Sequence, residues 1–200
     1  LFNKGADPHQ LLLSATPIPR TLSLTIFGDM DTSIIDEMPP GRQPVETSTA
    51  KTFSEIAPKV GEVLNNGGQV YVVCPLIEAS DERDWISVEE AAEKISDYFP
   101  EKNIACLTGQ QSWEEKDLIM HSFKSGEIDI VIATTVVEVG VDNPNATLIV
   151  IENADCFGLS QLHQLRGRVG RGSKQSECIL ISRQKSESER LKILVSTNDG

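Results

Sequence analysis

The sequence predicts a doubly wound α/β domain, and three observations lead to this fold class. Short apolar runs alternate along the chain with longer segments of helical pattern. Several of these runs are continuously apolar, which is typical of strands buried on both faces of a parallel sheet. The 200 residues are 39% hydrophobic and 24% charged, the balance of a globular protein with its own core. Strands and helices in alternation indicate βαβ units, with helices on both faces of the sheet.

Seven apolar runs are expected to be strands, and capping patterns mark the start of two helices. The expected strands cover residues 11–14, 45–49, 70–74, 104–107, 128–134, 147–151 and 178–182. Ser87 and Ser112 are each followed three residues later by glutamate, which is the spacing of a capping box at a helix start. We expect the second helix to end at Gly126, because glycine accepts the left-handed conformation that often follows a helix.

A proline-rich segment at residues 39–44 (PPGRQP) divides the chain. Proline removes an amide donor and fixes φ, so this segment is predicted to be a connection and not part of an element. Before it lie one expected strand, a helix near residues 19–27 and a short strand at 33–36, too little to bury a core. The sequence therefore predicts two parts: residues 1–38, the end of a preceding domain, and residues 39–200, the α/β domain.

The acidic net charge of the chain, −12 with a pI near 4.7, would normally argue against a nucleic-acid partner. The charge is unevenly distributed, however. Residues 156–176 contain no acid and four bases, namely Arg166, Arg168, Arg171 and Lys174. A solvated basic face is the simple interpretation of such a run. The spacing inside the run also fits a phosphate-bearing ligand.

Cysteine and hydropathy patterns exclude several other classes. The four cysteines are widely spaced, with no C-x-x-C pair and no histidine pair at ligand spacing: Cys74, Cys106, Cys156 and Cys178. This pattern argues against a metal site or a disulfide framework and is consistent with a reducing cytosol. No apolar run approaches the roughly 18 residues that a membrane span needs. We therefore expect a cytoplasmic protein without a metal centre of its own.

The segment Gln164–Arg171 (QLRGRVGR) contains the strongest candidate for phosphate chemistry. If the chain is helical from Leu159, one stripe presents Gln164, Arg168 and Arg171. A second stripe faces the core with Leu162, Leu165 and Val169. Guanidinium groups are permanently charged and planar, and they donate paired hydrogen bonds to phosphate oxygens. Two of them on a rigid element suit the stabilisation of a transferring phosphoryl group, although an intramolecular salt bridge is the alternative.

Glycines within this segment point to a close contact. Gly167 and Gly170 would each weaken a helix by about 1 kcal/mol relative to alanine, so we expect another part of the molecule to approach the backbone there. No segment matches the P-loop pattern G-x-x-x-x-G-K-[ST]. The chain thus offers arginines for phosphate chemistry but no phosphate cradle.

Polar residues follow two of the expected strands. Thr134 and Thr135 stand where hydroxyls and amides could hold a nucleic-acid phosphate, although a simple turn is the alternative. Further along the chain, Gly140 and Asp142 could approach a ribose or orient an arginine. After the strand at 11–14, small hydroxyl residues could relay a change at a phosphate site, or merely precede a proline-started helix: Ser14, Ala15 and Thr16.

These motifs, in order, resemble motifs III, V and VI of superfamily 2 helicases. They are Ser-Ala-Thr, Thr-Thr-x-x-x-x-Gly-Val-Asp and Gln-x-x-Gly-Arg-x-Gly-Arg. Five longer segments resemble the bacterial RecG family of ATP-dependent DNA helicases: SATPIPRTL (14–22), IIDEMPPGRQP (34–44), VVCPLIE (72–78), ATTVVEVGVDNPNAT (133–147) and IENADCFGLSQLHQLRGRVGRG (151–172).

The resemblance implies a fold and a set of residue roles. RecG proteins contain two RecA-like domains with ATP and Mg²⁺ between them, and this chain corresponds to the second domain after the end of the first. Catalytic arginine fingers are implied at Arg168 and Arg171. Further nucleotide contacts are implied at Gln164, Gly140 and Asp142. DNA contacts are implied at Thr108, Gly109, Thr134 and Thr135, and coupling of hydrolysis to movement at Ser14, Ala15 and Thr16.

The resemblance also implies partners, and the sequence departs from the family at two places. Forked or branched DNA is the implied substrate, and the first RecA-like domain and a wedge domain of the same chain are the implied partners. The P-loop and DExH box would precede Leu1, so we expect the 200 residues alone to lack ATPase activity. Gly109-Gln-Gln-Ser112 replaces the usual Gly-Arg/Lys-Met, and Asn143 replaces an apolar residue.

Two alternatives remain open from the sequence. The transcription-repair coupling factor has a motor with similar motifs III and VI. A non-catalytic α/β module could use the basic segment to bind an acidic partner. The family resemblance favours a bacterial, nucleoid-associated helicase over both of them.

Overall fold

A computed structural model describes residues 31, 33, 43–76, 86–134, 143–184 and 188–197. The chain divides into two units, residues 1–37 with Gly200 and residues 38–199. Every helix and strand of the described residues belongs to the second unit. The strand and helix expected at 11–14 and 19–27, and the prolines of the expected boundary at 39 and 40, lie outside the described residues.

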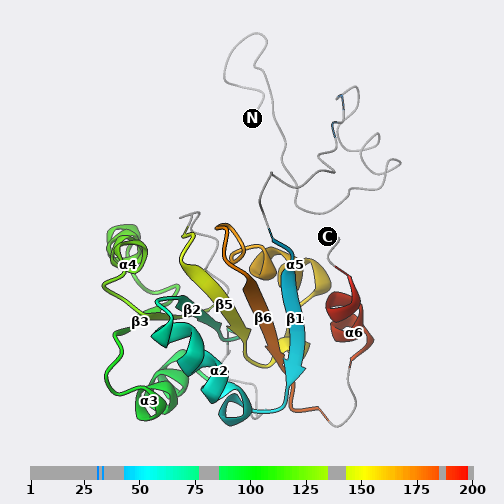
Figure 1. The fold of residues 1–200 in the computed structure, drawn as a ribbon, viewed down its shortest axis with the longest axis horizontal. Coiled ribbons are helices and arrows are strands. Elements are labelled where there is room, and N and C mark those ends of the chain that lie inside the picture. Colours follow the sequence, from blue (N-terminus) through cyan, green and yellow to red (C-terminus); the bar gives the residue numbers. More distant parts are fainter. Residues whose placement is uncertain are drawn as a thin grey trace. The chain divides into compact units, whose positions relative to one another are not determined.

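Six strands form one parallel sheet in the described part of the chain (Figure 1). They are β1 (Val45–Ala50), β2 (Gln69–Val73), β3 (Ile104–Leu107), β4 (Ile130–Ala133), β5 (Ala146–Ile151) and β6 (Ser176–Ile181). The spatial order is β1-β6-β5-β2-β4-β3, and every neighbouring pair is parallel. Parallel neighbours need crossover connections, which accounts for the alternation of strands and helices along the chain. The predicted fold class is confirmed.

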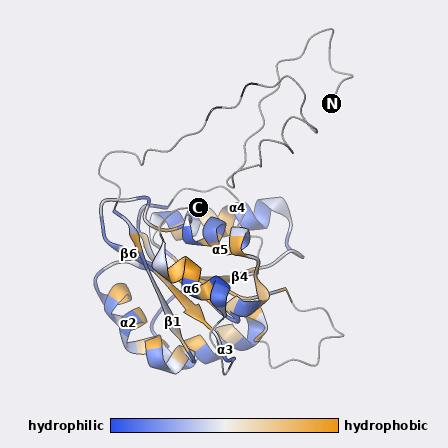
Figure 2. Ribbon diagram, turned by 90° about the vertical axis from the view of Figure 1, so that its right-hand side faces the viewer, coloured by the Kyte–Doolittle hydropathy of each residue, from blue (hydrophilic) through white to orange (hydrophobic). Residues whose placement is uncertain are grey.

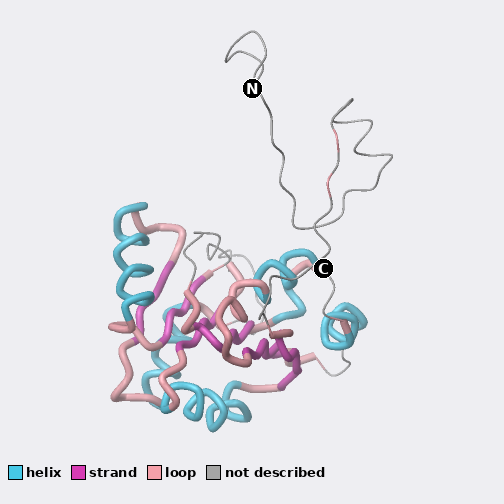
Figure 3. The backbone as a smooth tube through the Cα atoms, turned by 45° about the horizontal axis from the view of Figure 1, so that its top comes forward, coloured by secondary structure: helices cyan, strands magenta, loops and turns pink. Residues whose placement is uncertain are grey.

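Helices cover both faces of this sheet (Figures 2 and 3). On one face α2 (Phe53–Asn65) and α3 (Val88–Tyr98) contribute to one buried cluster. The opposite face carries a second cluster, to which α4 (Trp113–Ser125), α5 (Leu159–Arg166) and α6 (Glu189–Ser196) contribute. A short 3₁₀ helix, η1 (Ala154–Cys156), connects β5 to α5.

Strand β2 shows why the strands read as unbroken apolar runs. Its side chains alternate between the two faces, so that Tyr71 and Val73 belong to the α4–α6 cluster while Val70 and Val72 belong to the α2–α3 cluster. All four are at most 2% exposed. Because both faces are covered by helices, the four positions after Gln69 are all apolar, unlike the alternating pattern of a half-solvated sheet.

Both predicted capping boxes are present. The Ser87 hydroxyl accepts a hydrogen bond from the Glu90 amide at 3.1 Å, and Ser112 accepts one from Glu115 at 3.2 Å. The return bonds from the serine amides to the two glutamates are also formed. Hydrogen bonds from Ser112 hold the pKa of Glu115 below its usual value. Helix α4 ends at Ser125, and the predicted Gly126 follows as its left-handed cap with φ of 87°.

The amino edge of the sheet, where the strands begin, contains a β-bulge between β2 and β5. Gln69 pairs with Ala146 and Val70 pairs with Leu148, so Thr147 has no partner on β2. Gly68 is essential to this arrangement. A Cβ atom there would lie 2.6 Å from the Thr147 hydroxyl oxygen and 2.8 Å from a methyl group of Val63. The bulge and the glycine together let the start of β5 approach the end of α2.

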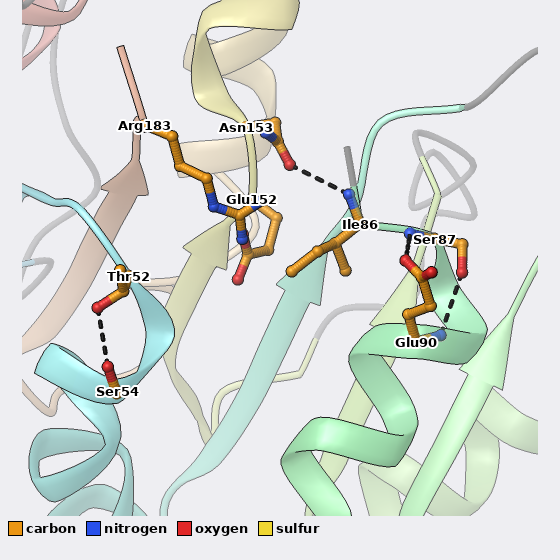
Figure 4. A network of polar contacts seen from close by, with 8 residues as sticks. All are labelled: Thr52, Ser54, Ile86, Ser87, Glu90, Glu152, Asn153 and Arg183. Carbon is orange, nitrogen blue, oxygen red and sulfur yellow. Dashed lines mark hydrogen bonds and ion pairs between the residues drawn. The ribbon is translucent and has the colours of Figure 1, made fainter. Parts of the chain in front are cut away.

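A polar network follows β5 at the opposite, carboxyl edge (Figure 4). Glu152 is 3% exposed, and its carboxylate lies 3.3 Å from the Arg183 guanidinium. Burial raises the pKa of Glu152, although Arg183 and Lys94 act in the opposite direction. The next residue, Asn153, has a positive φ of 48°, and its side-chain oxygen accepts from the Ile86 amide at 3.5 Å. Glu152 and Asn153 of this network form the turn that leads the chain from β5 into η1 and α5.

Replacing Gly68 with alanine should destabilise the protein, because the new methyl group would overlap Thr147 and Val63. Overpacking of this kind costs about 1–3 kcal/mol. Gly61→Ala is the matched control within α2, where a Cβ would meet only the Phe99 ring at 3.4 Å. Chemical denaturation should show a lower free energy of unfolding for Gly68→Ala only. Equal values for the two variants would contradict the close approach at the bulge.

Replacing Glu152 with glutamine should stabilise the protein at neutral pH. The raised pKa means that the folded state holds the carboxyl proton more tightly than the unfolded state, so the parent protein loses stability as pH rises above about 4.5, the ordinary glutamate value. The advantage of Glu152→Gln should therefore be present at pH 7.5 and vanish near pH 4. Unfolding free energies at both pH values check this, with exposed Glu101→Gln as the control. A Glu152→Gln variant less stable than its parent at pH 7.5 would contradict the prediction.

Candidate functional site

The arginines of the basic segment lie in a turn, not on a helix. Helix α5 ends at Arg166, and Gly167 caps it. Arg168 and Arg171 lie beyond the helix, in a segment that we call the arginine turn (residues 167–172). The prediction of one helical stripe through Arg171 is therefore wrong. Gly170 has φ of 73°, a left-handed conformation that cannot continue a right-handed helix.

The apolar half of the same prediction is confirmed. The three side chains expected to face the core are buried: Leu162, Leu165 and Val169. Gln164 is exposed on α5, Arg168 is half-buried and Arg171 is exposed. The Arg171 side chain folds back, and its Nε donates a hydrogen bond to the Gly167 carbonyl at 3.1 Å. The core-facing side of α5 thus anchors the segment, while the turn carries the two candidate arginines.

The arginine turn is packed tightly between two other segments. A Cβ on Gly170 would lie 2.7 Å from a methyl group of Val45, and a Cβ on Gly172 would lie 2.7 Å from the Pro144 carbonyl oxygen. Val45 begins β1 and Pro144 precedes β5, so the turn lies at the amino edge of the sheet. The expected close approach is confirmed at Gly170, and it also occurs at Gly172. At Gly167 no such atom lies nearer than 3.4 Å.

Arg166, another base of this run, has a structural role. It is 6% exposed, and its Nη1 donates to the carbonyls of Leu194 at 3.0 Å and Thr197 at 2.6 Å. Its Nη2 lies 3.1 Å from Nδ1 of His163. Burial lowers the pKa of His163, and the charge of Arg166 lowers it further. The neutral ring can therefore accept this bond.

A second arginine, Arg190, connects helices α5 and α6. Arg190 lies in the first turn of α6, and its guanidinium donates to the carbonyls of Phe157 and Asp155, each at 3.2 Å. These carbonyls belong to the segment that leads into α5. Arg166 and Arg190 thus connect α6 to both ends of α5, and they hold the helix that carries the arginine turn.

The candidate DNA contacts of β3 and β4 lie at the carboxyl edge. The Thr134 amide donates to the Leu107 carbonyl at 3.2 Å, so the residues that follow the two strands are neighbours. Gly109 is exposed and Thr108 is half-buried. Thr134 is 6% exposed, and its hydroxyl has no hydrogen-bond partner among the described residues. Thr108 and Thr134 therefore directly follow neighbouring strands, and their roles as DNA contacts stay predictions.

Gln111, one of the residues at which the sequence departs from the family, holds this loop in place. Its side chain donates to the Cys106 carbonyl at 3.0 Å and accepts from the Thr108 amide at 2.9 Å. The amide side chain thereby closes the turn that follows β3. Gln110 remains exposed at the position where the family has arginine or lysine. The sequence signal for this role of Gln111 is an amide side chain in a short turn, which can donate one hydrogen bond and accept another within a few residues.

Six other predicted site residues lie outside the described part of the chain: Ser14, Ala15, Thr16, Thr135, Gly140 and Asp142. Their roles stay predictions. Within the described ranges, no cluster of three or more His, Cys, Asp or Glu side chains could hold a metal ion. No helix in those ranges has the length and apolarity to cross a bilayer. The described candidates therefore form two groups at opposite edges of the sheet, one with arginines and one with loop hydroxyls and amides.

Known proteins resemble this chain along its whole length. The ATP-dependent DNA helicase RecG of Bacillus subtilis is 51% identical over 205 residues, which cover all of this chain and 30% of that protein. RecG of Streptococcus pneumoniae is 49% identical, again over the whole chain and 31% of that protein. The chain thus spans about 30% of the length of these curated relatives.

A solved structure of RecG bound to a three-way DNA junction also matches. It is 41% identical, with a TM-score of 0.73, over 90% of this chain and 24% of the RecG chain. The family model of the helicase conserved C-terminal domain matches residues 55–173, which include β2 to β5, α5 and the arginine turn. Fold, motifs and relatives therefore agree: the chain belongs to the helicase conserved C-terminal domain family.

Proposed function

We propose that this chain is the second motor domain of a RecG-type, ATP-dependent DNA helicase that remodels branched DNA. The arginine turn carries the proposal. It holds Arg168 and Arg171 on a backbone that is confined on two sides, as a residue that must meet a phosphate in a defined place requires. The similar RecG structure is bound to a three-way DNA junction. We therefore infer that forked or branched DNA, including Holliday junctions, is the substrate of the whole protein.

The two arginines would act on the charge that develops during phosphoryl transfer. ATP with Mg²⁺, bound mainly by the first motor domain, supplies the γ-phosphoryl group. Arg168 and Arg171 donate hydrogen bonds to its oxygens when the two domains close, and Gln164 contacts the nucleotide. Gly140 and Asp142 are further nucleotide contacts in this proposal. Guanidinium donors suit the role because they stay charged at every physiological pH.

The division of the chain follows the same proposal. Residues 1–38 are the end of the first motor domain, in which Ser14, Ala15 and Thr16 couple hydrolysis to movement. Residues 39–200 are the second motor domain. Because the sequence contains no P-loop pattern, the 200 residues alone should not hydrolyse ATP. The first motor domain and the wedge domain of the whole protein complete the machinery.

DNA would bind the opposite edge of the sheet from the arginine turn. Thr108, Gly109, Thr134 and Thr135 offer hydroxyls and amides, which position a phosphate backbone without reading its sequence. A chain with net charge −12 has little general attraction for DNA. The other domains must therefore supply most of the affinity. A rigid sheet between the two edges lets domain closure around ATP move the DNA loops as one body.

Replacing Arg168 with alanine in the intact protein should abolish DNA-stimulated ATP hydrolysis while largely preserving DNA binding. The loss of an arginine finger lowers the rate by about 10³–10⁵-fold. Lys174→Ala is the control, because this exposed base lies in the same run but outside the arginine turn. Steady-state ATPase assays and nucleotide-free DNA binding measure the two effects. Unchanged hydrolysis in Arg168→Ala would contradict the proposed function, as would a parent protein without DNA-dependent ATPase activity.

Replacing Gln110 with arginine should tighten DNA binding by the intact protein. The exposed side chain lies next to Gly109, and a new phosphate contact there should steepen the dependence of log K on log salt by about 0.9. Ser125→Arg adds the same charge at the other end of α4 and is the control. Binding titrations at several salt concentrations distinguish the variants. An equal change of slope in both would place the DNA elsewhere.

A further inference from the structure

The turn that abuts the arginine turn is itself held by a buried pair of amide side chains. We propose that Asn143 and Gln69 are positioning residues for ATP hydrolysis: they fix the turn at residues 143–145, against which the arginine turn packs. This inference rests on the proposed function of Arg168 and Arg171. It assigns a role to the departure from the family at Asn143, which the proposed function leaves unexplained.

Asn143 uses both ends of its side-chain amide. It is 1% exposed, and its Oδ1 accepts from the Asn145 backbone amide at 3.0 Å. Its Nδ2 donates to Oε1 of Gln69 at 3.1 Å. The Asn143 carbonyl accepts from the Ala146 amide at 3.3 Å, which closes the turn. An apolar side chain at this position would remove both side-chain bonds at once.

Gln69 determines the direction of the bond between the two side chains. It is 5% exposed, and its Nε2 donates to the backbone carbonyls of Phe123 and, at 2.6 Å, Ile128. With the amino group committed to two carbonyls, only Oε1 remains for Asn143, so Asn143 must be the donor. The Gln69 backbone amide also donates to the Asn145 carbonyl at 2.9 Å. Gln69 thus joins the turn to the end of α4 and to β2.

Pro144 transmits this placement to the arginine turn. It lies between Asn143 and Asn145, and its carbonyl oxygen would be 2.7 Å from a Cβ on Gly172. Only a glycine fits so close to another backbone. On the other side of Arg171, Gly170 meets Val45 with the same closeness. A displacement of the 143–145 turn would therefore change the space in which Arg171 and its neighbours are held, because packed interiors have few voids to absorb it.

The proposed role predicts a kinetic signature that differs from a simple loss of stability. Neither Asn143 nor Gln69 belongs to the arginine turn, so the pair acts through Pro144 and Gly172. Interactions that matter only in the transition state change kcat and leave the KM for ATP unaltered. A misplacement of about 1 Å in such a site can lower the rate by about 10²-fold.

The test uses the intact protein with Asn143→Leu, Gln69→Leu and the double variant. We expect each single variant to lower the kcat of DNA-stimulated ATP hydrolysis by about 10- to 100-fold. The KM for ATP and nucleotide-free DNA affinity should not change. Because both variants remove the bond between Asn143 and Gln69, the loss of kcat in the double variant should be smaller than the two single losses combined. Asn143→Asp keeps the acceptor for the Asn145 amide but removes the donor to Gln69, so it should also lower kcat and carries the test if Asn143→Leu does not fold.

Asn103→Leu is the matched structural control. Its Nδ2 donates to the Glu127 carbonyl at 2.8 Å near the same edge of the sheet, where β3 begins, and it has no bond to the 143–145 turn. Thermal unfolding should show some loss of stability in this variant, with kcat unchanged. A fall in kcat that is equal in Asn103→Leu and Asn143→Leu would overturn the inference, and so would additive losses in the double variant.

Arg168→Ala, measured in parallel, separates this inference from the proposed function. A large loss of ATPase activity in Arg168→Ala together with unchanged kcat in Asn143→Leu and Asn143→Asp overturns the positioning role alone. Unchanged activity in Arg168→Ala overturns the proposed function itself.

Discussion

Close packing of the arginine turn against Val45 and Pro144 at the amino edge of the sheet is the constraint on which the candidate arginine site depends. Gly170 and Gly172 leave no room for a side chain against Val45 and Pro144. The arginine between them is therefore placed by its backbone, while its long side chain stays exposed to solvent. An arginine at the end of a helix is positioned only by the last helical turn. A turn confined on two sides fixes the backbone position from which the arginine side chain extends. This suits a group that must meet a phosphate in one geometry.

The basic segment divides its charges between structure and chemistry. Arg166 is buried and donates hydrogen bonds to carbonyls at the end of α6. Arg190 on α6 donates hydrogen bonds to carbonyls of the segment before α5. In the proposed function, Arg168 and Arg171 are the two that act on a ligand. The net charge of −12 describes the whole chain and is a poor guide to this segment, because phosphate recognition by a few donors depends on local geometry more than on total charge.

At both departures from the family sequence, the side chain of an amide residue closes a turn. Gln111 closes the loop after β3 at the carboxyl edge, and Asn143 closes the turn before β5 at the amino edge. In each case an amide side chain donates at one end and accepts at the other, which replaces backbone hydrogen bonds that a short turn lacks. Both turns lie next to residues that are proposed to meet a ligand, and the hydrogen bonds of these amides hold the backbone of the two turns.

Local interactions determined what the sequence by itself could predict. The strands, the capping boxes at Ser87 and Ser112, the left-handed Gly126 and the buried side of α5 all depend on residues a few positions apart. Tertiary structure alone decided the strand order, the end of α5 at Arg166 and the pairing of Gln69 with Asn143, 74 residues away. The glycines of the basic segment indicated a close contact but not its partners. Val45 and Pro144 reach the arginine turn only because the parallel sheet brings the starts of β1, β6 and β5 to one edge, and such long-range packing leaves no pattern in the local sequence.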